Sequence, residues 1–392
     1  MTVLIDPPEA HGHGRLWSHV ASDLSFDELH AFASGLGIPE RGFDRDHYDL
    51  PSEWYERALA AGAVAVSSRE LISRITAAGL RRPKSRTLAP RRPGRVLLRP
   101  PRLRRGDLVA VVTPAGPVDA GRLARGVEVL HSWGLEARLD HTEAGRLPWL
   151  AGGDAERAAQ LTAAWTDPEV RAVWTARGGY GAQRVLDLLD WGALAAASPR
   201  LLVGFSDTTA LHQAFAARLG LATLHAAGVA ALGDGDPASV EATRRVAFDG
   251  GPVDLGGRPD PRGGRAEGVL LGGNLTVLAA SAGTEATRPA AGGIAFLEDV
   301  GEQPYRVDRM LTQLLRSGWF DGVRGVALGN FTRCGDPDQV QKVLDERLGP
   351  LGVPVVVGLP VGHERTNHPL LLGVRATLDG TAGILHLEKT LR

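Results

Sequence analysis

Cysteine, aromatic residues and long apolar runs are scarce in this chain of 392 residues. The single cysteine, Cys334, excludes an intramolecular disulfide, a cysteine-rich zinc ribbon and a cysteine-ligated cluster. The longest apolar stretches, such as residues 353–361, are short and broken by Pro and Gly, so we expect none to span a bilayer. The first residues carry no basic flank and predict no signal peptide. A cytoplasmic protein is expected.

A charge excess of either sign is also missing. The chain holds 44 Lys and Arg against 45 Asp and Glu, which gives a formal net charge of −1. No general attraction to nucleic acid or to an anionic membrane is therefore expected. Residues 81–105 are the exception, with eleven Lys or Arg, five Pro and no acid. This composition predicts an extended linker. The alternative, a nucleic-acid-binding arm, lacks the interleaved aromatic residues that stack on bases.

The predicted linker separates regions that differ in their patterns of apolar residues. Residues 1–80 carry short strand and helix patterns, and Ser25 and Ser67 each precede a Glu by three residues, which is the capping-box spacing. We expect a small α/β unit there. In residues 106–250, apolar strands at 108–113, 170–175 and 201–205 alternate with helical patterns, which predicts a doubly wound parallel sheet. Residues 250–268 look like a loop, and short strand-like pieces in residues 265–392 predict a β-rich C-terminal domain.

A buried strand turns sharply toward a helix at Ser206, within Gly-Phe-Ser-Asp at 204–207. A nucleophilic serine needs such a turn, because it lifts Oγ out of the sheet next to helical N–H groups. A simpler interpretation is that Ser206 or Asp207 only caps the helix. Another strand meets a helix at the glycine-rich residues 176–181, which suit either a phosphate or an oxyanion.

Glu298 and His363 each follow an apolar strand, where site residues on a sheet tend to occur. Taken singly, a carboxylate or histidine at such a place is usually solvated. Together with Ser206 they supply a nucleophile, a general base and an orienting acid. Cys334, in a Gly/Asp/Pro loop, competes only weakly as a nucleophile.

Several motifs occur in one order along the chain: Arg-Gly-Gly-Tyr-Gly at 177–181, Gly-Phe-Ser-Asp at 204–207, Leu-Gly-Gly-Asn-Leu at 271–275, Leu-Glu-Asp at 297–299, Asp-Arg-Met-Leu at 308–311, and Gly-His at 362–363 with Asn367 downstream. In this respect the chain, from about Leu103 to its end, resembles the LD-carboxypeptidases. These are serine peptidases that include muramoyltetrapeptide carboxypeptidases and microcin C7 self-immunity proteins.

The resemblance implies that Ser206 is the nucleophile, His363 the base and Glu298 its orienting partner. It also implies a site formed between two domains, a homodimer, and catalysis without a metal or other cofactor. We expect the backbone N–H groups of Gly179 and Asp207 to form the oxyanion hole. Arg177 and Tyr180, in the glycine-rich loop, are the candidate substrate-binding residues, with Arg177 suited to a terminal carboxylate.

The implied reaction is hydrolysis of an L,D-peptide bond, releasing terminal D-alanine from a muropeptide tetrapeptide in peptidoglycan recycling. His225-Ala226-Ala227 stands where family members often have His-Gly-Pro, which bears on substrate preference. Microcin-type members carry a longer, Trp-containing loop where this chain has Leu271, which favours peptidoglycan peptides. The alternatives are hydrolysis of peptidyl- or aminoacyl-nucleotides, and non-catalytic binding of glycopeptides or nucleotides.

The first eighty residues resemble a small bacterial domain family without assigned activity, in Thr-Val-Leu-Ile-Asp-Pro-Pro at 2–8 and Phe-Asp-Arg-Asp-His-Tyr at 43–48. Five of the twelve histidines lie within the first fifty residues. The candidate ligands for a metal ion or a phosphate are Asp6, His13, His19, Asp46 and His47. The dense ligand spacing of motifs such as H-E-x-x-H is missing.

Overall fold

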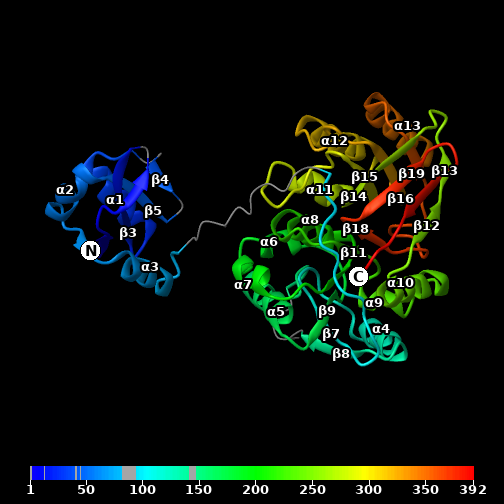
Figure 1. The fold of residues 1–392 in the computed structure, drawn as a ribbon, viewed down its shortest axis with the longest axis horizontal. Helices are drawn as coiled ribbons and strands as arrows, with labels where there is room; N and C mark the ends of the chain where they lie inside the picture. Colours follow the sequence, from blue (N-terminus) through cyan, green and yellow to red (C-terminus); the bar gives the residue numbers. More distant parts are fainter. Residues whose placement is uncertain (1, 13, 40–41, 45, 82–93, 141–146) are drawn as a thin grey trace. The chain divides into compact units, whose positions relative to one another are not determined.

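The structure is a computed structural model that describes residues 2–12, 14–39, 42–44, 46–81, 94–140 and 147–392. The chain divides into two compact units, Met1–Arg86 and Thr87–Arg392, each of which is described by itself (Figure 1). Within the described residues, no helix is long and apolar enough to cross a membrane. His13 and residues 82–93 of the predicted linker lie outside the described residues.

The first unit is a mixed sheet between two layers of helices. Its strand order is β4-β5-β3-β1-β6, with β2 added beside β3. The strands are β1 (Val3–Ile5), β2 (Ala10–Gly12), β3 (Arg15–Ser22), β4 (Phe43–Asp44), β5 (His47–Pro51) and β6 (Val64–Ala65). The helices are α1 (Phe26–Leu36), α2 (Tyr55–Ala60), preceded by a 3-10 turn (Ser52–Trp54), and α3 (Ser68–Ala77). Apolar residues of α1 and α2 pack on one face of the sheet and those of α3 on the other.

Both predicted helix starts in this unit are confirmed. The Oγ atoms of Ser25 and Ser67 accept hydrogen bonds from the backbone N–H groups of Glu28 and Glu70, each at 3.1 Å. The sequence does not predict β3 or β5, because polar residues interrupt their apolar alternation. In the structure these polar residues have partners: the backbone N–H and ring of His19 both bond to Asp6.

The second unit begins with a six-stranded sheet in the order β18-β11-β10-β9-β7-β8. Its strands are β7 (Leu108–Val112), β8 (Glu136–Asp140), β9 (Val170–Thr175), β10 (Leu201–Gly204), β11 (Thr223–His225) and β18 (Leu370–Leu372). All neighbours are parallel except β18, which comes from far down the chain and pairs antiparallel with β11.

Helices cover both faces of this sheet, so the predicted doubly wound fold is confirmed. One face carries α4 (Ala120–Ser132), α9 (Val229–Leu232) and α10 (Pro237–Asp249). The other face carries α5 (Asp154–Thr166), α6 (Ala182–Val185), α7 (Trp191–Ala196) and α8 (Thr209–Ala214), which continues as a π-helical turn (Phe215–Leu219).

An eight-stranded sheet in the order β12-β20-β19-β14-β15-β16-β17-β13 forms the rest of the second unit, as the predicted β-rich region. Its strands are β12 (Val253–Gly256), β13 (Arg258–Pro259), β14 (Arg265–Asn274), β15 (Gly293–Val300), β16 (Gly325–Thr332), β17 (Val355–Val357), β19 (Arg375–Asp379) and β20 (Ile384–Leu387). Its helices are α11 (Leu275–Ser281), α12 (Pro304–Arg316) and α13 (Pro337–Leu348), followed by a 3-10 turn (Gly349–Leu351). One buried apolar cluster joins residues of both sheets, so their cores are continuous.

Two segments differ from their predicted character. Residues 250–268, predicted as a loop, contain β12, β13 and the start of β14, because Val253 and Leu255 bury alternate side chains in an antiparallel pairing with β20. Part of the predicted linker is built into the second unit. The N–H of Leu97 bonds to the carbonyl of Gly373 at 2.8 Å, that of Leu103 bonds to Ala247 at 2.9 Å, and both leucines are buried.

Candidate active site

Ser206 occupies a strained turn directly after β10. It opens a 3-10 turn (Ser206–Thr208) that leads into α8, and its φ of 62° lies in the left-handed region. A residue with a Cβ adopts this conformation at a cost of about 1–3 kcal/mol, which is typical of functional sites. No side-chain cap bond is made at the start of this turn, and Ser206 Oγ contacts His363 instead. The helix-cap interpretation therefore does not describe Ser206.

The structure brings Ser206, His363 and Glu298 into one line. His363 Nε2 lies 2.9 Å from Ser206 Oγ, and His363 Nδ1 lies 2.7 Å from Glu298 Oε2. Glu298 is on β15 and is completely buried, whereas the His363 ring is 15% exposed at the surface of the site. A proton on Nδ1 that is donated to Glu298 leaves the Nε2 lone pair facing the Ser206 hydroxyl. This geometry suits proton transfer from the serine.

A second pair of motifs fixes the strand that carries Glu298. Asn274, at the end of β14, donates through Nδ2 to Asp299 Oδ1 at 3.0 Å and accepts at Oδ1 from Val277 N, which caps α11. Burial raises the pKa of Asp299 to about 6, although hydrogen bonds from Thr276, Val300 and Asn274 oppose the shift. The sequence contains these residues as motifs but does not indicate what they do.

Gly273 allows the C-terminal sheet to approach the nucleophile helix. Its φ is 138°, and a Cβ at this position would lie 2.5 Å from Thr209 Oγ1 in α8. The next backbone N–H, of Asn274, donates to the same hydroxyl at 3.0 Å. The C-terminal sheet is therefore in direct contact with the helix that follows Ser206.

Short-range contacts also position His363. Its ring centroid lies 4.9 Å from that of Phe205, and the preceding N–H, of Gly362, donates to Asn367 Oδ1 at 3.0 Å. Asn367 belongs to a motif singled out in the sequence, whereas the packing role of Phe205 is not predicted. The position of Phe205 directly before Ser206 in the sequence is the signal that could have identified this packing role.

The glycine-rich loop lies against the nucleophile. A Cβ on Gly178 would be 3.0 Å from Ser206 Cβ and 3.2 Å from the backbone N of Asp207. The Asp207 carboxylate is buried, which raises its pKa, and it accepts the N–H of Ala182 at 2.7 Å. Its backbone N–H, and that of Gly179, stay as predicted oxyanion donors.

Arg177 and Tyr180 are both exposed on this loop. The Arg177 guanidinium donates to the carbonyl of Pro117 at 3.0 Å, so one of its N–H groups is already engaged. Their roles in substrate binding stay predictions. Cys334 is buried, and burial raises the pKa of its thiol, which is unfavourable for a nucleophile.

A cavity of about 250 Å³ opens beside His363. Phe205, Asn367 and Arg365 are among its lining residues, and Arg365 brings a positive charge that the sequence analysis did not single out. A larger cavity of about 760 Å³ is lined by several arginines, including Arg102 and Arg200, but by none of the three aligned residues. Of these two cavities, the smaller is therefore the one that reaches the aligned residues, through His363.

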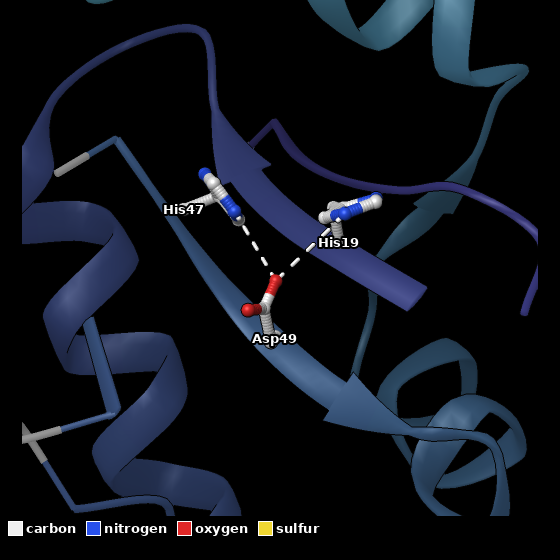
Figure 2. A group of neighbouring side chains, drawn as sticks. All are labelled: His19, His47 and Asp49. Atoms are coloured by element: carbon white, nitrogen blue, oxygen red, sulfur yellow. Dashed lines mark ion pairs between the residues drawn. The ribbon is translucent and has the colours of Figure 1, made fainter. Parts of the chain in front are cut away.

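The first unit brings together four of its five candidate ligands, while the fifth, His13, lies outside the described residues. His19 and His47 converge with Asp49, a residue the sequence analysis missed (Figure 2). Asp6 and Asp46 bond to the far sides of the two imidazoles. The available signal for Asp49 was its spacing of two from His47, because alternate residues of a strand share one face.

Comparison with known families gives matches over most of the chain. Residues 109–226 match the LD-carboxypeptidase N-terminal domain, and residues 267–378 match the LD-carboxypeptidase C-terminal domain. Residues 3–78 match a family described as protein of unknown function.

Individual relatives cover the second unit. A putative carboxypeptidase of Streptomyces coelicolor is 50% identical over 305 residues, which are 75% of this chain and 97% of that protein. The murein tetrapeptide carboxypeptidase of Pseudomonas aeruginosa is 38% identical, over 69% of this chain and 93% of that protein. The microcin C7 self-immunity protein of Escherichia coli is 26% identical, over 70% and 91%. The crystal structure of muramoyltetrapeptide carboxypeptidase from Oxalobacter formigenes superposes with a TM-score of 0.66 at 33% identity, covering 73% of this chain and all of that chain.

Proposed function

The chain belongs to the LD-carboxypeptidase family, and on this premise we propose that it is a serine carboxypeptidase with the triad Ser206, His363 and Glu298. The observation that carries the proposal is the continuous contact from Ser206 Oγ through both ring nitrogens of His363 to Glu298. The three residues come from separate segments of the chain. Their alignment has the order nucleophile, base and orienting acid that acyl transfer requires.

In the proposed mechanism, Ser206 Oγ attacks the scissile carbonyl while His363 Nε2 takes the hydroxyl proton. Glu298 holds the Nδ1 proton, fixes the tautomer and stabilises the imidazolium that forms. His363 then donates its proton to the leaving amine. In the second half of the reaction, His363 takes a proton from the water that attacks the acyl-enzyme and returns it to Ser206 Oγ. The N–H groups of Gly179 and Asp207 are proposed to stabilise the oxyanion.

The proposed substrate is a muropeptide tetrapeptide whose terminal D-alanine is released by cleavage of an L,D-peptide bond. Support comes from the murein tetrapeptide carboxypeptidase among the relatives and from the short segment at Leu271. Arg177 and Arg365 are candidate partners for the terminal carboxylate, because guanidinium groups pair with carboxylates in a bidentate manner. Tyr180 is proposed to contact the peptide from the same loop. We also propose that the enzyme acts as a homodimer, on the family resemblance, and that it is cytoplasmic, on the sequence expectations given above.

The decisive experiment offers the protein two tetrapeptides that differ only in the configuration of the terminal alanine. We expect release of alanine from the D-terminated peptide, detected by mass spectrometry of the tripeptide product, and a far slower reaction of the L-terminated peptide. Inverting that centre exchanges the methyl group and the carboxylate, so the scissile carbonyl no longer reaches Ser206 in the same pose. The Ser206→Ala variant serves as the control for contaminating peptidases.

The same assay separates the alternatives. Rapid cleavage of an aminoacyl-sulfamoyl or aminoacyl-adenylate substrate, with no loss of alanine from either tetrapeptide, would instead indicate a microcin-type hydrolase. Binding of both peptides without hydrolysis, together with no labelling of Ser206 by a serine-directed covalent probe, would indicate a non-catalytic binding protein.

A further inference from the structure

The first unit holds two histidines and an aspartate on one face of its sheet, outside the proposed peptidase site. His19 on β3 is directly opposite Asp49 on β5 in the antiparallel register, and His47 precedes Asp49 by two residues on the same strand. Because alternate residues of a strand share a face and opposite residues of paired strands adjoin, the three side chains must converge. Figure 2 shows Asp49 between the two imidazole rings.

The distances among these side chains suit a metal ion. His47 Nε2 lies 3.2 Å and His19 Nε2 3.8 Å from Asp49 Oδ1, and one potential ligand atom from each residue falls within 4.8 Å of the others. Ligand atoms around a tetrahedral Zn²⁺ with bonds near 2.0–2.1 Å are roughly 3.4 Å apart. Only a small contraction of the side chains would therefore close the three groups around an ion.

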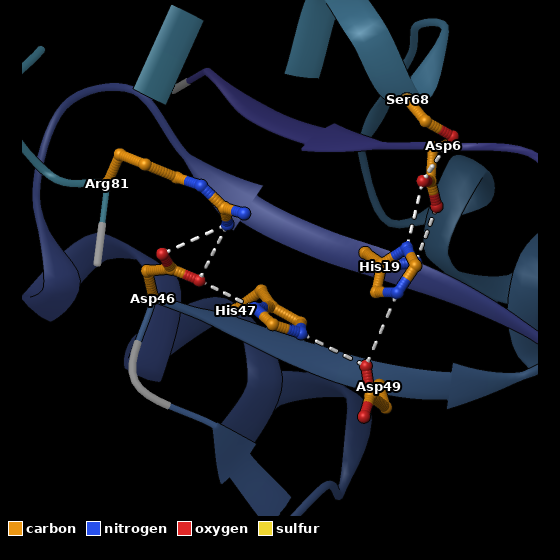
Figure 3. Close-up of polar contacts among 7 residues, drawn as sticks. All are labelled: Asp6, His19, Asp46, His47, Asp49, Ser68 and Arg81. Atoms are coloured by element: carbon orange, nitrogen blue, oxygen red, sulfur yellow. Dashed lines mark hydrogen bonds and ion pairs between the residues drawn. The ribbon is translucent and has the colours of Figure 1, made fainter. Parts of the chain in front are cut away.

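Two buried carboxylates orient the imidazoles for this purpose. His19 Nδ1 lies 2.9 Å from Asp6 Oδ2, and His47 Nδ1 lies 2.6 Å from Asp46 Oδ1 (Figure 3). Both aspartates are buried. A carboxylate that accepts the Nδ1 proton leaves Nε2 as the free lone pair, which is the arrangement found behind most metal-bound histidines. Both Nε2 atoms point toward Asp49.

Further contacts hold the supporting carboxylates in place. Asp6 also accepts the backbone N–H of His19 at 2.5 Å and the Ser68 hydroxyl at 2.7 Å. Asp46 pairs with the Arg81 guanidinium at 3.1 Å. Asp6, behind His19, is thereby held by the first residue of α3, and Asp46, behind His47, is held by the Arg81 guanidinium. The two imidazoles are therefore held in place by their supporting carboxylates.

The local charge favours a cation over an anion. Among the seven residues in Figure 3, three carboxylates face one guanidinium and two histidines. Imidazoles that bind a metal ion through Nε2 are neutral, so the side chains drawn would then carry two more negative than positive charges, which matches a divalent cation. Burial opposes a charged His47, but hydrogen bonds to Asp46 and Asp49 raise its pKa to about 9, so the ion must displace a proton from this ring at neutral pH. Imidazole nitrogen with a single carboxylate is a donor set of divalent transition metals, whereas Ca²⁺ and Mg²⁺ prefer oxygen. The side chains of His19 and Asp49 are 35% and 43% exposed, so the ion would be reached from solvent.

We propose that the first unit binds one divalent transition-metal ion of the zinc class through His19 Nε2, His47 Nε2 and an Asp49 carboxylate oxygen. Three protein ligands leave a fourth position of a tetrahedral ion open to water or to an exogenous oxygen ligand. Asp6 and Asp46 act as positioning residues. Nothing in this site depends on the chemistry proposed for Ser206.

Titration of the chelator-treated, dialysed full-length chain with Zn²⁺ and Co²⁺ tests the proposal. Calorimetry should give one Zn²⁺ per chain, and Co²⁺ should develop the visible absorption of a low-coordinate site. Asp49→Asn, an isosteric change at an exposed side chain, should weaken Zn²⁺ binding by about 100-fold or more, since even the loss of a supporting partner costs about 10–100-fold. Asp46→Asn should weaken it by that smaller factor.

The matched control is His386→Gln, because His386 Nδ1 also pairs with a carboxylate, Asp254, at 2.5 Å in an exposed pair of the second unit. This variant should bind Zn²⁺ as the unchanged chain does. Circular dichroism and melting of the metal-free variants establish that each is folded, and Zn²⁺ should raise the melting temperature of the unchanged chain but not that of Asp49→Asn.

Three outcomes would overturn the proposal. The first is no stoichiometric Zn²⁺ binding by the unchanged chain, and the second is equal affinity in the folded Asp49→Asn variant. The third is stoichiometric binding of inorganic phosphate that is lost in His19→Gln, because it would identify an anion site at the same residues.

Discussion

In the proposed mechanism, the three triad residues act as a unit. The losses of kcat caused by substituting Ser206, His363 and Glu298 should therefore be far from additive. We expect Ser206→Ala and His363→Ala each to lower kcat by roughly 10⁶-fold, and Glu298→Gln by roughly 10⁴-fold, because the remaining residues cannot work without the missing one. A double variant should be no slower than the worse single one. Steady-state kinetics on the D-terminated tetrapeptide measure these ratios.

His386→Ala is the control for the histidine substitution, since His386 also pairs with a carboxylate but lies outside the triad. It should leave kcat unchanged. Near-normal turnover by folded Ser206→Ala would show that another group is the nucleophile.

His212 makes the second unit sensitive to acid. Burial lowers the pKa of His212 to about 4, against a hydrogen bond between Nε2 and the Gly204 carbonyl that raises it. The unfolded chain takes up this proton near the ordinary pKa of 6.5 and the folded chain only near 4. The neutral ring therefore contributes its full stability above pH 6.5, and that contribution is lost as the pH falls toward 4.

The variant His212→Gln keeps an amide donor for Gly204 but does not titrate. We compare how much the free energy of unfolding falls when the pH is lowered from about 7 to about 4.5. This loss should be smaller in the variant than in the unchanged chain, by roughly 2 to 3 kcal/mol. Urea unfolding followed by tryptophan fluorescence measures both. The Asp299 carboxyl, whose pKa is raised to about 6, has the opposite sign but cancels in the comparison. Equal pH slopes would contradict the prediction.

At the scale of elements, the end of β14 links Glu298's strand to the nucleophile helix through Asn274. We expect Asn274→Ala to lower the free energy of unfolding by about 2 to 3 kcal/mol, because it removes the cap of α11 and a donor to the buried Asp299 carboxylate. Denaturant melts measure this loss, and kcat should fall with it because β15 carries Glu298.

Asp336→Ala is the matched cap removal, since Asp336 caps α13 by accepting the N–H of Asp338 at an exposed position. It should cost only about 1 kcal/mol and leave kcat unchanged. An equal loss of kcat in the two variants would refute the special role of Asn274.

Patterns confined to one element were predictable, and contacts between elements were not. Ser25 and Ser67 carry their capping signal within four residues, and the alternation of apolar strands with helices indicates the doubly wound sheet. Asp49 was missed because its relation to His19 exists only through the register of β3 and β5. The arrangement of Asn274 with Asp299 depends on two parallel strands whose pairing no local pattern encodes.

At the scale of the whole molecule, the second unit should work without the first. A shortened chain of residues 94–392 should keep its peptidase activity and melting temperature, because all three proposed triad residues and their supporting contacts lie within it. A chain of residues 106–392 should melt at a distinctly lower temperature, because it loses the buried Leu97 and Leu103, each worth about 1.5–3 kcal/mol. Calorimetry and the tetrapeptide assay compare the two. Loss of activity in residues 94–392 would show that the first unit takes part in catalysis.

Chelation should separate the two proposed sites. Treatment of the full chain with a chelator should empty the proposed metal site while tetrapeptide hydrolysis proceeds at an unchanged rate, since a serine–histidine–glutamate triad supplies its own nucleophile and base. Activity and bound zinc are measured on the same samples. Inhibition that zinc reverses would instead point to metal-assisted hydrolysis.

The antiparallel pairing of β18 with β11 has a consequence for how the protein is made. A nascent chain that has not yet emerged from the ribosome as far as residue 370 lacks β18, the strand that covers β11 at the edge of the parallel sheet of the second unit. An uncovered strand edge can pair with other chains, so we expect the incomplete chain to be prone to aggregation during this interval of synthesis. His363 lies shortly before β18 in the chain. A nascent chain that ends before His363 would therefore be prone to aggregation and would lack the proposed general base.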